Sequence, residues 1–273
     1  MKNLNFNVYS PLHKTGHTSK GDQLKWKVGD MWYKADYMGY EGLSEVLISS
    51  LLQKSSCTYP FVVYESVAIE YNGKTFQGCS SLDFLKENQV LIPLEKLYRR
   101  YTGESLAVKL TEFADTSERI QYLVEQIEEI TGLNDFGKYM TAMLEIDTFF
   151  MNEDRHTNNI AVIYDEKTQQ YSLSPFFDQG LCLFADTRQD YPLDFSLEQC
   201  MEKIEAKPFC TDFYEQLEAA EDLYGTQIRF KFTIKDIQTE IQKAASGYQR
   251  EICSRVEALL RTQMRKYAYL LEN

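Results

Sequence analysis

The chain has 273 residues, of which 44% are hydrophobic and 14% aromatic, and this excludes an intrinsically disordered protein. That length permits one large domain or two lobes that share a cleft. Its 29 basic and 41 acidic residues give a net charge of −12, which repels phosphate backbones and argues against nucleic acid as a partner. A single nucleotide is still compatible, because a few cations inside a cleft act locally.

The cysteines and the apolar segments bear on where the protein works. Six cysteines are scattered through the chain without a C-x-x-C pair, so we expect reduced thiols and a cytoplasmic protein. The chain starts without an apolar signal segment and has no run of about 18 apolar residues, so we expect no membrane partner. A protein delivered to a host cell by a signal-independent route would have the same features.

Strand and turn signals dominate the first part of the chain, where two predicted strands flank a Gly-Asp turn and two more follow a helix. The helix is predicted at 43–51, because its apolar residues recur at intervals of three and four. This mixture predicts a small α+β lobe over residues 1–82. The predicted strands are 24–28, 31–37, 61–64 and 66–71.

Beyond residue 82 the pattern becomes mainly helical. Amphipathic periodicity predicts helices at 120–130 and 136–150, and the last seventy residues predict three or four more, ending in a long one. Between them, 160–164 and 171–177 predict an isolated hairpin. We therefore expect an α+β fold of two lobes, with a helical C-terminal lobe over 83–273.

The most informative segment is Asn152-Glu-Asp-Arg-His-Thr-Asn-Asn-Ile160, which follows a helix and precedes the hairpin. Asp154 and Asn159 lie five residues apart, and Asp178 follows the hairpin. Phosphoryl transfer requires a carboxylate that positions the acceptor, oxygen ligands for Mg²⁺ and a cation on the phosphates. These three residues supply the carboxylate and the oxygen ligands in that order. Each of them alone is equally compatible with a solvated loop or a cap.

The D-R-H-x-x-N segment, the hairpin and the Phe-Phe-Asp that follows resemble HipA-like kinases and phosphoinositide kinases. The overall length and the segments described below look most like small HipA-related bacterial kinases of the CtkA type. This resemblance covers residues 10 to 260 and implies a serine/threonine protein kinase with a protein-kinase-like fold. The His-Arg-Asp order of ordinary protein kinases is reversed here, and Gln179-Gly180 replaces Phe-Gly after the metal-binding aspartate. The resemblance implies ATP and Mg²⁺ as cofactors and a protein as the acceptor.

The resemblance also assigns roles to the residues of the catalytic segment. Asp154 is the catalytic base or orients the acceptor, and Asn159 and Asp178 hold Mg²⁺. His156 stabilises charge on the transferred group, and Arg155 positions the loop.

A strand lysine that binds the phosphates and a helix glutamate that orients it complete such a site. Lys34 lies on a predicted strand, and Glu45 follows eleven residues later in the predicted helix. Lys25 and Lys27 remain alternatives to Lys34, because alternate residues of a strand share a face. Glu41 remains an alternative to Glu45, and surface positions remain open for both charges.

Two further segments are predicted to contact the nucleotide. Ser19, Lys20 and Gly21 resemble the phosphate-covering loop of HipA-like kinases, and Ser19 is a hypothetical autophosphorylation site. The strand around Ala68 is where we expect the hinge that binds adenine through its main chain. After Asp178, the hydroxyls of Thr187 and Tyr191 are weaker candidates for regulation.

The sequence leaves the acceptor open. A small-molecule or lipid kinase has the same motif, although the chain shows no basic patch for a lipid surface. A nucleotide-binding pseudokinase that acts through a protein partner is a third hypothesis. An antitoxin-like or host protein is a possible partner under each of these hypotheses.

Overall fold

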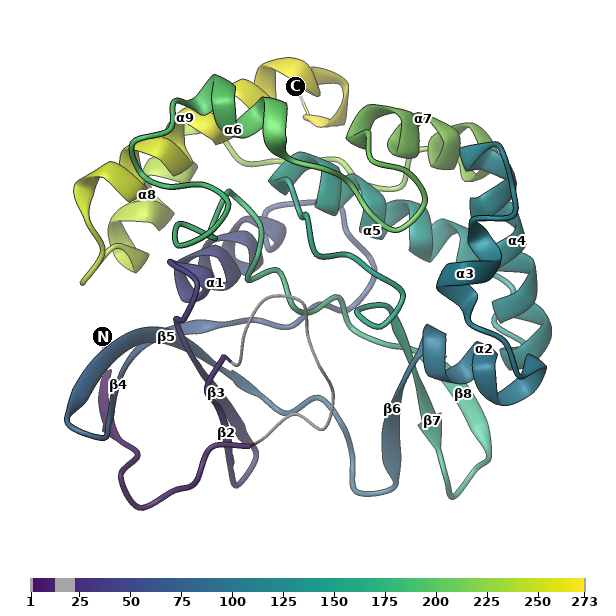
Figure 1. The fold of residues 1–273 in the computed structure, drawn as a ribbon, viewed down its shortest axis with the longest axis horizontal. Coiled ribbons are helices and arrows are strands. Elements are labelled where there is room, and N and C mark those ends of the chain that lie inside the picture. The colour runs from purple at the N-terminus through teal and green to yellow at the C-terminus, as the bar shows by residue number, and fades with distance from the viewer. Residues whose placement is uncertain (1, 13–22, 273) are drawn as a thin grey trace.

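The computed structural model describes residues 2–12 and 23–272, in which a five-stranded sheet lies beside a larger helical body (Figure 1). The strand order of this sheet is β1-β4-β5-β3-β2, with β1 and β4 parallel and the other pairs antiparallel. The strands are β1 (Lys2–Asn5), β2 (Lys25–Val28), β3 (Met31–Ala35), β4 (Glu65–Tyr71) and β5 (Lys74–Leu82).

The sheet confirms the predicted hairpin, since β2 and β3 pair around the turn at Gly29. Strand β1 was not predicted, because Leu4 is the only apolar residue among its four. The strand predicted at 61–64 is wrong. Residues 61 and 62 instead reach the helical body, where Val62 N donates to Phe176 O at 2.9 Å.

Helix α1 (Glu41–Leu52) lies between the sheet and the helical body (Figure 1). A Cβ atom on Gly42 would lie 2.7 Å from the Cα atom of Gly78, so these two glycines allow α1 to lie directly against β5. The apolar side chains of α1 belong to the large core of the helical body. The sheet has a smaller core of its own, formed by Phe6, Trp26, Ala35, Val67 and Ile69.

A second sheet has the order β6-β7-β8 and joins the helical body at its lower edge (Figure 1). The predicted hairpin forms β7 and β8, but it is not isolated, because β6 pairs along β7. Strand β6 follows directly after the connection between the two halves, and its apolar residues Val90-Leu91-Ile92 are consecutive, so it lacks the alternation of apolar and polar side chains that signals a strand. The strands are β6 (Gln89–Pro93), β7 (Ala161–Asp165) and β8 (Gln170–Leu173).

The helices of the C-terminal half form one body around α5 and confirm both amphipathic predictions. Helix α5 buries every residue except Lys138, which is why its sequence is apolar on nearly all sides. The helices are α2 (Leu94–Thr102), α3 (Leu106–Leu110), α4 (Thr116–Thr131), α5 (Phe136–Phe150), α6 (Leu197–Lys203), α7 (Phe213–Tyr224), α8 (Ile234–Ala244) and α9 (Arg250–Lys266).

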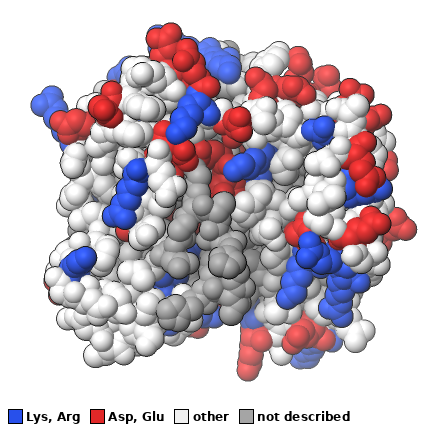
Figure 2. Space-filling model, viewed as in Figure 1, with Lys and Arg blue, Asp and Glu red and all other residues white. Residues whose placement is uncertain are grey.

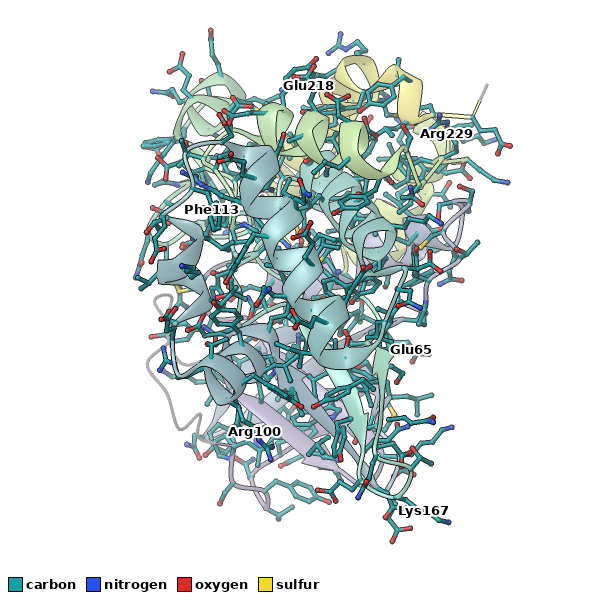
Figure 3. The ribbon with its side chains drawn as sticks, turned by 90° about the vertical axis from the view of Figure 1, so that its right-hand side faces the viewer. Glu65, Arg100, Phe113, Lys167, Glu218 and Arg229 are labelled. Carbon is teal, nitrogen blue, oxygen red and sulfur yellow. The ribbon has the colours of Figure 1, made fainter. Side chains whose placement is uncertain are left out.

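The two other views place charges and ends on this framework. Lys167 marks the tip of the β7–β8 hairpin at one end of the molecule, and Glu218 and Arg229 lie at the other (Figure 3). Acidic and basic side chains are interspersed over the helical half of the face in Figure 2, whereas the sheet half of that face carries fewer charges. Across the described ranges, no helix is long and apolar enough to cross a membrane. All six cysteines are free thiols.

Candidate active site

A cavity of about 630 Å³ lies between the five-stranded sheet and the helical body. Besides the alternatives Lys25 and Glu41, five of the predicted site residues line it. They come from a strand of the sheet and from two loops of the helical body, so the fold brings together segments more than 100 residues apart. The five are Lys34, Asp154, His156, Asn159 and Asp178.

Lys34 is the lysine that contacts the helix glutamate. Its Nζ lies 2.6 Å from Glu45 Oε1 and 2.8 Å from Asp178 Oδ1. Lys25 also lines the cavity, but its Nζ is 3.9 Å from Asp178 Oδ1, and Lys27 pairs with Asp83. The geometry therefore places Lys34, among these three lysines, between a buried glutamate and the aspartate that follows the hairpin.

The two carboxylates keep Lys34 charged. Burial by itself would lower the pKa of the ammonium, but Asp178 and Glu45 raise the pKa well above its usual value. The side chain is 13% exposed, so the ammonium borders the cavity while its charge is compensated inside the protein. A fixed cation in this position can bind the phosphates of a nucleotide.

Glu41, the alternative to Glu45, holds the turn before α1. Its carboxylate accepts hydrogen bonds from the main-chain N–H groups of Tyr37, Met38 and Gly39, at 3.0, 2.6 and 2.9 Å. A carboxylate with three main-chain donors is satisfied within its own loop. Glu45 is accordingly the residue that links α1 to Lys34.

Helix α1 also positions the segment around Asp178. Gln179 N donates to Glu45 Oε2 at 3.0 Å, and the hydroxyl of Ser44 donates to Gln179 O at 2.9 Å. Asp178 itself has a φ of +64°, a left-handed conformation that is uncommon for residues other than glycine and is often found at functional sites. The strained aspartate is thus held from one side by α1 and from the other by Lys34.

The loop after α5 organises Asp154 and Asn159 around each other. Helix α5 ends at Phe150, and the φ of +55° at the next residue, Met151, turns the chain towards the cavity. Asn159 Nδ2 donates to the main-chain oxygen of Asp154 at 2.8 Å and to Asp154 Oδ2 at 3.1 Å. His156 Nε2 lies 3.9 Å from Asp154 Oδ1. The two predicted catalytic side chains and the asparagine therefore form one cluster at the cavity wall.

Arg155 connects the loop after α5 to the helix itself. Its guanidinium binds Asp147 of α5 through two hydrogen bonds, Nε to Oδ2 at 2.7 Å and Nη2 to Oδ1 at 3.0 Å. Its Nη1 donates to the main-chain oxygens of Asn159 and Phe177, at 2.9 and 3.3 Å. Burial alone would lower the pKa of Arg155, but the ion pair with Asp147 raises it. One buried cation thus links the loop after α5 to Phe177, the residue before Asp178.

The oxygen atoms around the cavity fit a hard divalent cation. Asn159 uses its Nδ2 in both hydrogen bonds to Asp154, so the amide oxygen is the atom with which it can ligate a metal. Asp178 binds Lys34 through Oδ1 and adds carboxylate oxygen at the same cavity. One carboxylate and one amide oxygen, with phosphate and water completing the shell, suit Mg²⁺.

The predicted hinge at Ala68 is wrong. Ala68 lies in β4, away from the cavity, whereas the chain crosses between the two halves after β5, at 83–88. The crossing segment contributes Phe84 and Leu85 to the cavity, and the ring of Phe84 lies 5.8 Å from that of Phe177. The chain thus crosses one hairpin later than the sequence predicted. The signal for this crossing was the apolar pair Phe84-Leu85 directly after a strand.

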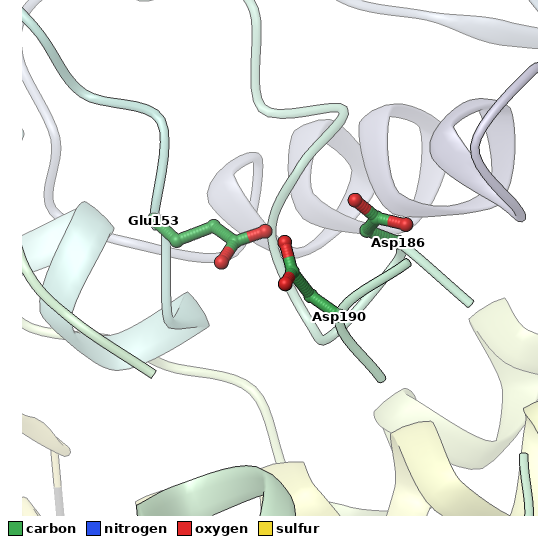
Figure 4. Close-up of side chains that lie close together, drawn as sticks. All are labelled: Glu153, Asp186 and Asp190. Atoms are coloured by element: carbon green, nitrogen blue, oxygen red, sulfur yellow. The ribbon is translucent and has the colours of Figure 1, made fainter. Parts of the chain in front are cut away.

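Ser19, Lys20 and Gly21 lie outside the described residues. An acidic cluster that was not predicted includes Glu153 of the loop after α5, where carboxylate oxygens of Glu153, Asp186 and Asp190 are within 4.8 Å of one another (Figure 4). None of these three lines the cavity.

Comparisons with known proteins agree with this architecture. No protein-family model and no curated protein matches the chain. Among solved structures, the crystal structure of the Helicobacter pylori proinflammatory kinase CtkA matches with a TM-score of 0.62 and 15% sequence identity. The match covers 98% of this chain and 96% of that one. Since a likeness at this identity shows the fold alone, the chain has the mixed α+β, kinase-like fold of CtkA that the resemblance implied.

Proposed function

We propose that the protein is an ATP-dependent serine/threonine protein kinase that transfers the γ-phosphoryl group of Mg-ATP to a protein hydroxyl. The observation that carries this proposal is the convergence of Lys34, Asp154, Asn159 and Asp178 on one cavity between the two halves. The kinase-like fold supports the same activity. The division into lobes at 1–82 and 83–273 belongs to the proposal.

The residues act mainly by positioning and by electrostatics. Lys34, kept protonated by Glu45 and Asp178, binds the phosphates of ATP. Asp154 accepts the proton of the acceptor hydroxyl as the oxygen–phosphorus bond forms and the bond to the departing ADP breaks. His156, which lines the cavity beside Asp154, donates a hydrogen bond to the transferred phosphoryl group.

Magnesium belongs to the same proposal. Asn159 and Asp178 would hold Mg²⁺, which when bound neutralises phosphate charge. The adenine would lie against the apolar wall that Phe84 of the crossing segment and Phe177 form together, since both line the cavity and their rings contact each other. The six free cysteines support a reducing, cytoplasmic location or delivery into a host cell, where an antitoxin-like or host protein would be the partner.

Transfer of labelled phosphate from ATP tests the proposal. We expect Mg²⁺-dependent labelling of a generic protein acceptor or of the chain itself. Asp154→Asn should lower the rate at least about 10²-fold, since general base catalysis contributes about 10²–10⁴-fold. The affinity for the nucleotide should remain, because in the proposal Lys34 binds the phosphates and Asn159 and Asp178 hold Mg²⁺. Asp222→Asn, at an exposed position on α7, is the matched control and should be fully active.

The same assay separates the alternatives. If an inositol lipid or an aminoglycoside is labelled and protein is not, the acceptor is a lipid or a small molecule instead of a protein. Binding of Mg-ATP without any transfer would favour the pseudokinase.

A further inference from the structure

The segment 181–196 runs from the candidate metal site to α6, at the position of the activation segment of a kinase. In protein kinases, this segment is commonly ordered when a phosphorylated residue pairs with arginines, one of which precedes the catalytic aspartate in the H-R-D motif. In this chain, the residue before Asp154 is Glu153, an anion that cannot bind phosphate. Another set of contacts must hold the segment.

One part of that set comes from the start of α1. Tyr40 donates its hydroxyl to Leu183 O at 2.6 Å, and Arg188 N donates to Met38 O at 3.0 Å. Leu183 and the following residue both have a left-handed backbone, with φ of +58° and +61°. The beginning of segment 181–196 is therefore bound directly to the helix that carries Glu45.

The second part comes from α9. Arg255 is 9% exposed and donates to the main-chain oxygens of Tyr191, Pro192 and Phe195, at 2.7, 2.6 and 3.1 Å. A guanidinium with three carbonyl partners holds the main chain through its rigid geometry. The end of segment 181–196 is thus fixed to the helical body by one side chain.

Tyr191 provides the link to the catalytic loop. It is 1% exposed, and its hydroxyl donates to Glu153 Oε2 at 2.5 Å. Burial and the carboxylate of Glu153 raise the pKa of Tyr191, so the hydroxyl stays protonated and remains a donor. Because Glu153 immediately precedes Asp154, this hydrogen bond ties segment 181–196 to the main chain of the candidate base.

The electrostatics oppose a phosphate in the same place. Glu153, Asp186 and Asp190 bring their carboxylate oxygens within 4.8 Å of one another (Figure 4). Lys203 binds Asp190 at 2.8 Å. A phosphate on Thr187 would add about two negative charges to the residue that follows Asp186, one of three residues whose carboxylates already lie close together. The carboxylates would repel this phosphate, whereas the arginines of a conventional kinase attract the phosphate of the activation segment.

We propose that Tyr191 and Arg255 are positioning residues that hold segment 181–196 in its working arrangement without phosphorylation of that segment. Hydrogen bonds from Tyr191 to Glu153 and from Arg255 to main-chain oxygens take the place of a phosphate–arginine pair. The inference rests on the proposed kinase activity for its kinetic consequence, whereas the order of the segment can be measured independently.

The first experiment compares Tyr191→Phe with the wild type and with Tyr214→Phe. Tyr214 is exposed and binds Glu218 at 3.0 Å, so it is a matched tyrosine–glutamate pair away from the site. For Tyr191→Phe we expect kcat for a protein acceptor to fall about tenfold, as for the loss of a charge-assisted hydrogen bond. The Kd of Mg-ATP should stay within twofold. Hydrogen exchange of 181–196 should accelerate, and Tyr214→Phe should match the wild type.

The second experiment uses the wild type treated with phosphatase and the variants Thr187→Ala and Thr187→Glu. We expect phosphatase and Thr187→Ala to leave kcat unchanged, and Thr187→Glu to lower it, because the new charge is added next to Asp186, a member of the acidic cluster. A rise in kcat with Thr187→Glu, or loss of activity after phosphatase, would overturn the inference.

Arg255→Lys is a second variant that tests the inference even if Tyr191→Phe does not fold. It keeps the charge but can satisfy fewer carbonyls, so exchange of 181–196 should be intermediate between the wild type and Tyr191→Phe. Unchanged exchange in both variants would also overturn the inference. If the wild type transfers no phosphate while its segment is protected and Tyr191→Phe exposes it, the proposed function fails and the positioning role stands.

Discussion

Two buried ion pairs flank the cavity, and they differ in what surrounds them. In the first, Lys34 contacts Glu45 at 2.6 Å, is 13% exposed, and has Asp178 as a further partner at the cavity. In the second, Arg155 contacts Asp147 at 2.7 Å, and both side chains are only 1% exposed. Arg155 does not line the cavity and gives its remaining hydrogen bonds to main-chain oxygens.

This difference separates chemistry from architecture. A lysine ammonium is a compact charge that can exchange one oxygen partner for another, whereas the arginine fork fixes several partners at once. We therefore expect Lys34 to act on the nucleotide and Arg155 to hold the catalytic loop on α5. The following changes test that separation.

The largest loss of stability is expected for Arg155→Met. Removal of one partner leaves Asp147 buried and without its cation, which costs about 3–5 kcal/mol of the free energy of unfolding. Urea denaturation measures it. Arg265→Met, at an exposed position of the same residue type, should change stability by less than about 0.5 kcal/mol. An Arg155→Met protein of normal stability but without activity would break the comparison, because the arginine would then belong to the chemistry.

Lys34→Met should affect catalysis more than folding. We expect kcat/KM for Mg-ATP to fall about 10²–10³-fold, equivalent to about 3–4 kcal/mol. The loss of stability should be smaller than for Arg155→Met, because burial raises the pKa of Glu45 and favours uptake of a proton. Lys74→Met, at an exposed strand position, is the control. Equal kinetics for both lysine variants would remove Lys34 from the site.

Arg155→Lys sharpens the role of the guanidinium. An ammonium can still bind Asp147 but cannot also reach both main-chain oxygens, so we expect a loss of about 2 kcal/mol. The comparison of its unfolding curve with that of Arg155→Met separates charge from geometry. Full stability of the lysine variant would show that charge alone suffices.

The smallest effect concerns Asp36, in the turn between Lys34 and α1. Its carboxyl accepts hydrogen bonds from the hydroxyl of Tyr248 at 2.7 Å and from Gly42 N at 2.6 Å, and burial raises its pKa from 3.8 to about 8. The folded state thus binds a proton that the unfolded state has released, and stability falls as the pH rises from about 4 to 8.

Asp36→Asn has no proton to lose in that range. Between pH 5 and pH 8 its stability relative to the wild type should rise by about 1 kcal/mol, a value reduced for the partial exposure of the side chain. Thermal unfolding at the two pH values measures the change. A difference that does not vary with pH would show that Asp36 ionises normally.

The sequence by itself determined the strongly periodic elements and the order of the candidate residues. The hairpin at β2–β3, the helices α4 and α5, and the segment from Asp154 to Asp178 all follow from patterns within about 25 residues. Local periodicity reports which face of an element is buried, and the spacing of oxygen-bearing side chains reports a type of chemistry. Neither depends on the rest of the chain.

Only the tertiary structure decided which residues meet. Lys25 and Lys34 are directly paired across β2 and β3, so both point to one face, and no sequence pattern could choose between them. The choice depends on Glu45 and on Asp178, which is 144 positions away. The crossing at 83–88 and the contact of Tyr191 with Glu153 are of the same kind, because packing between distant segments creates them.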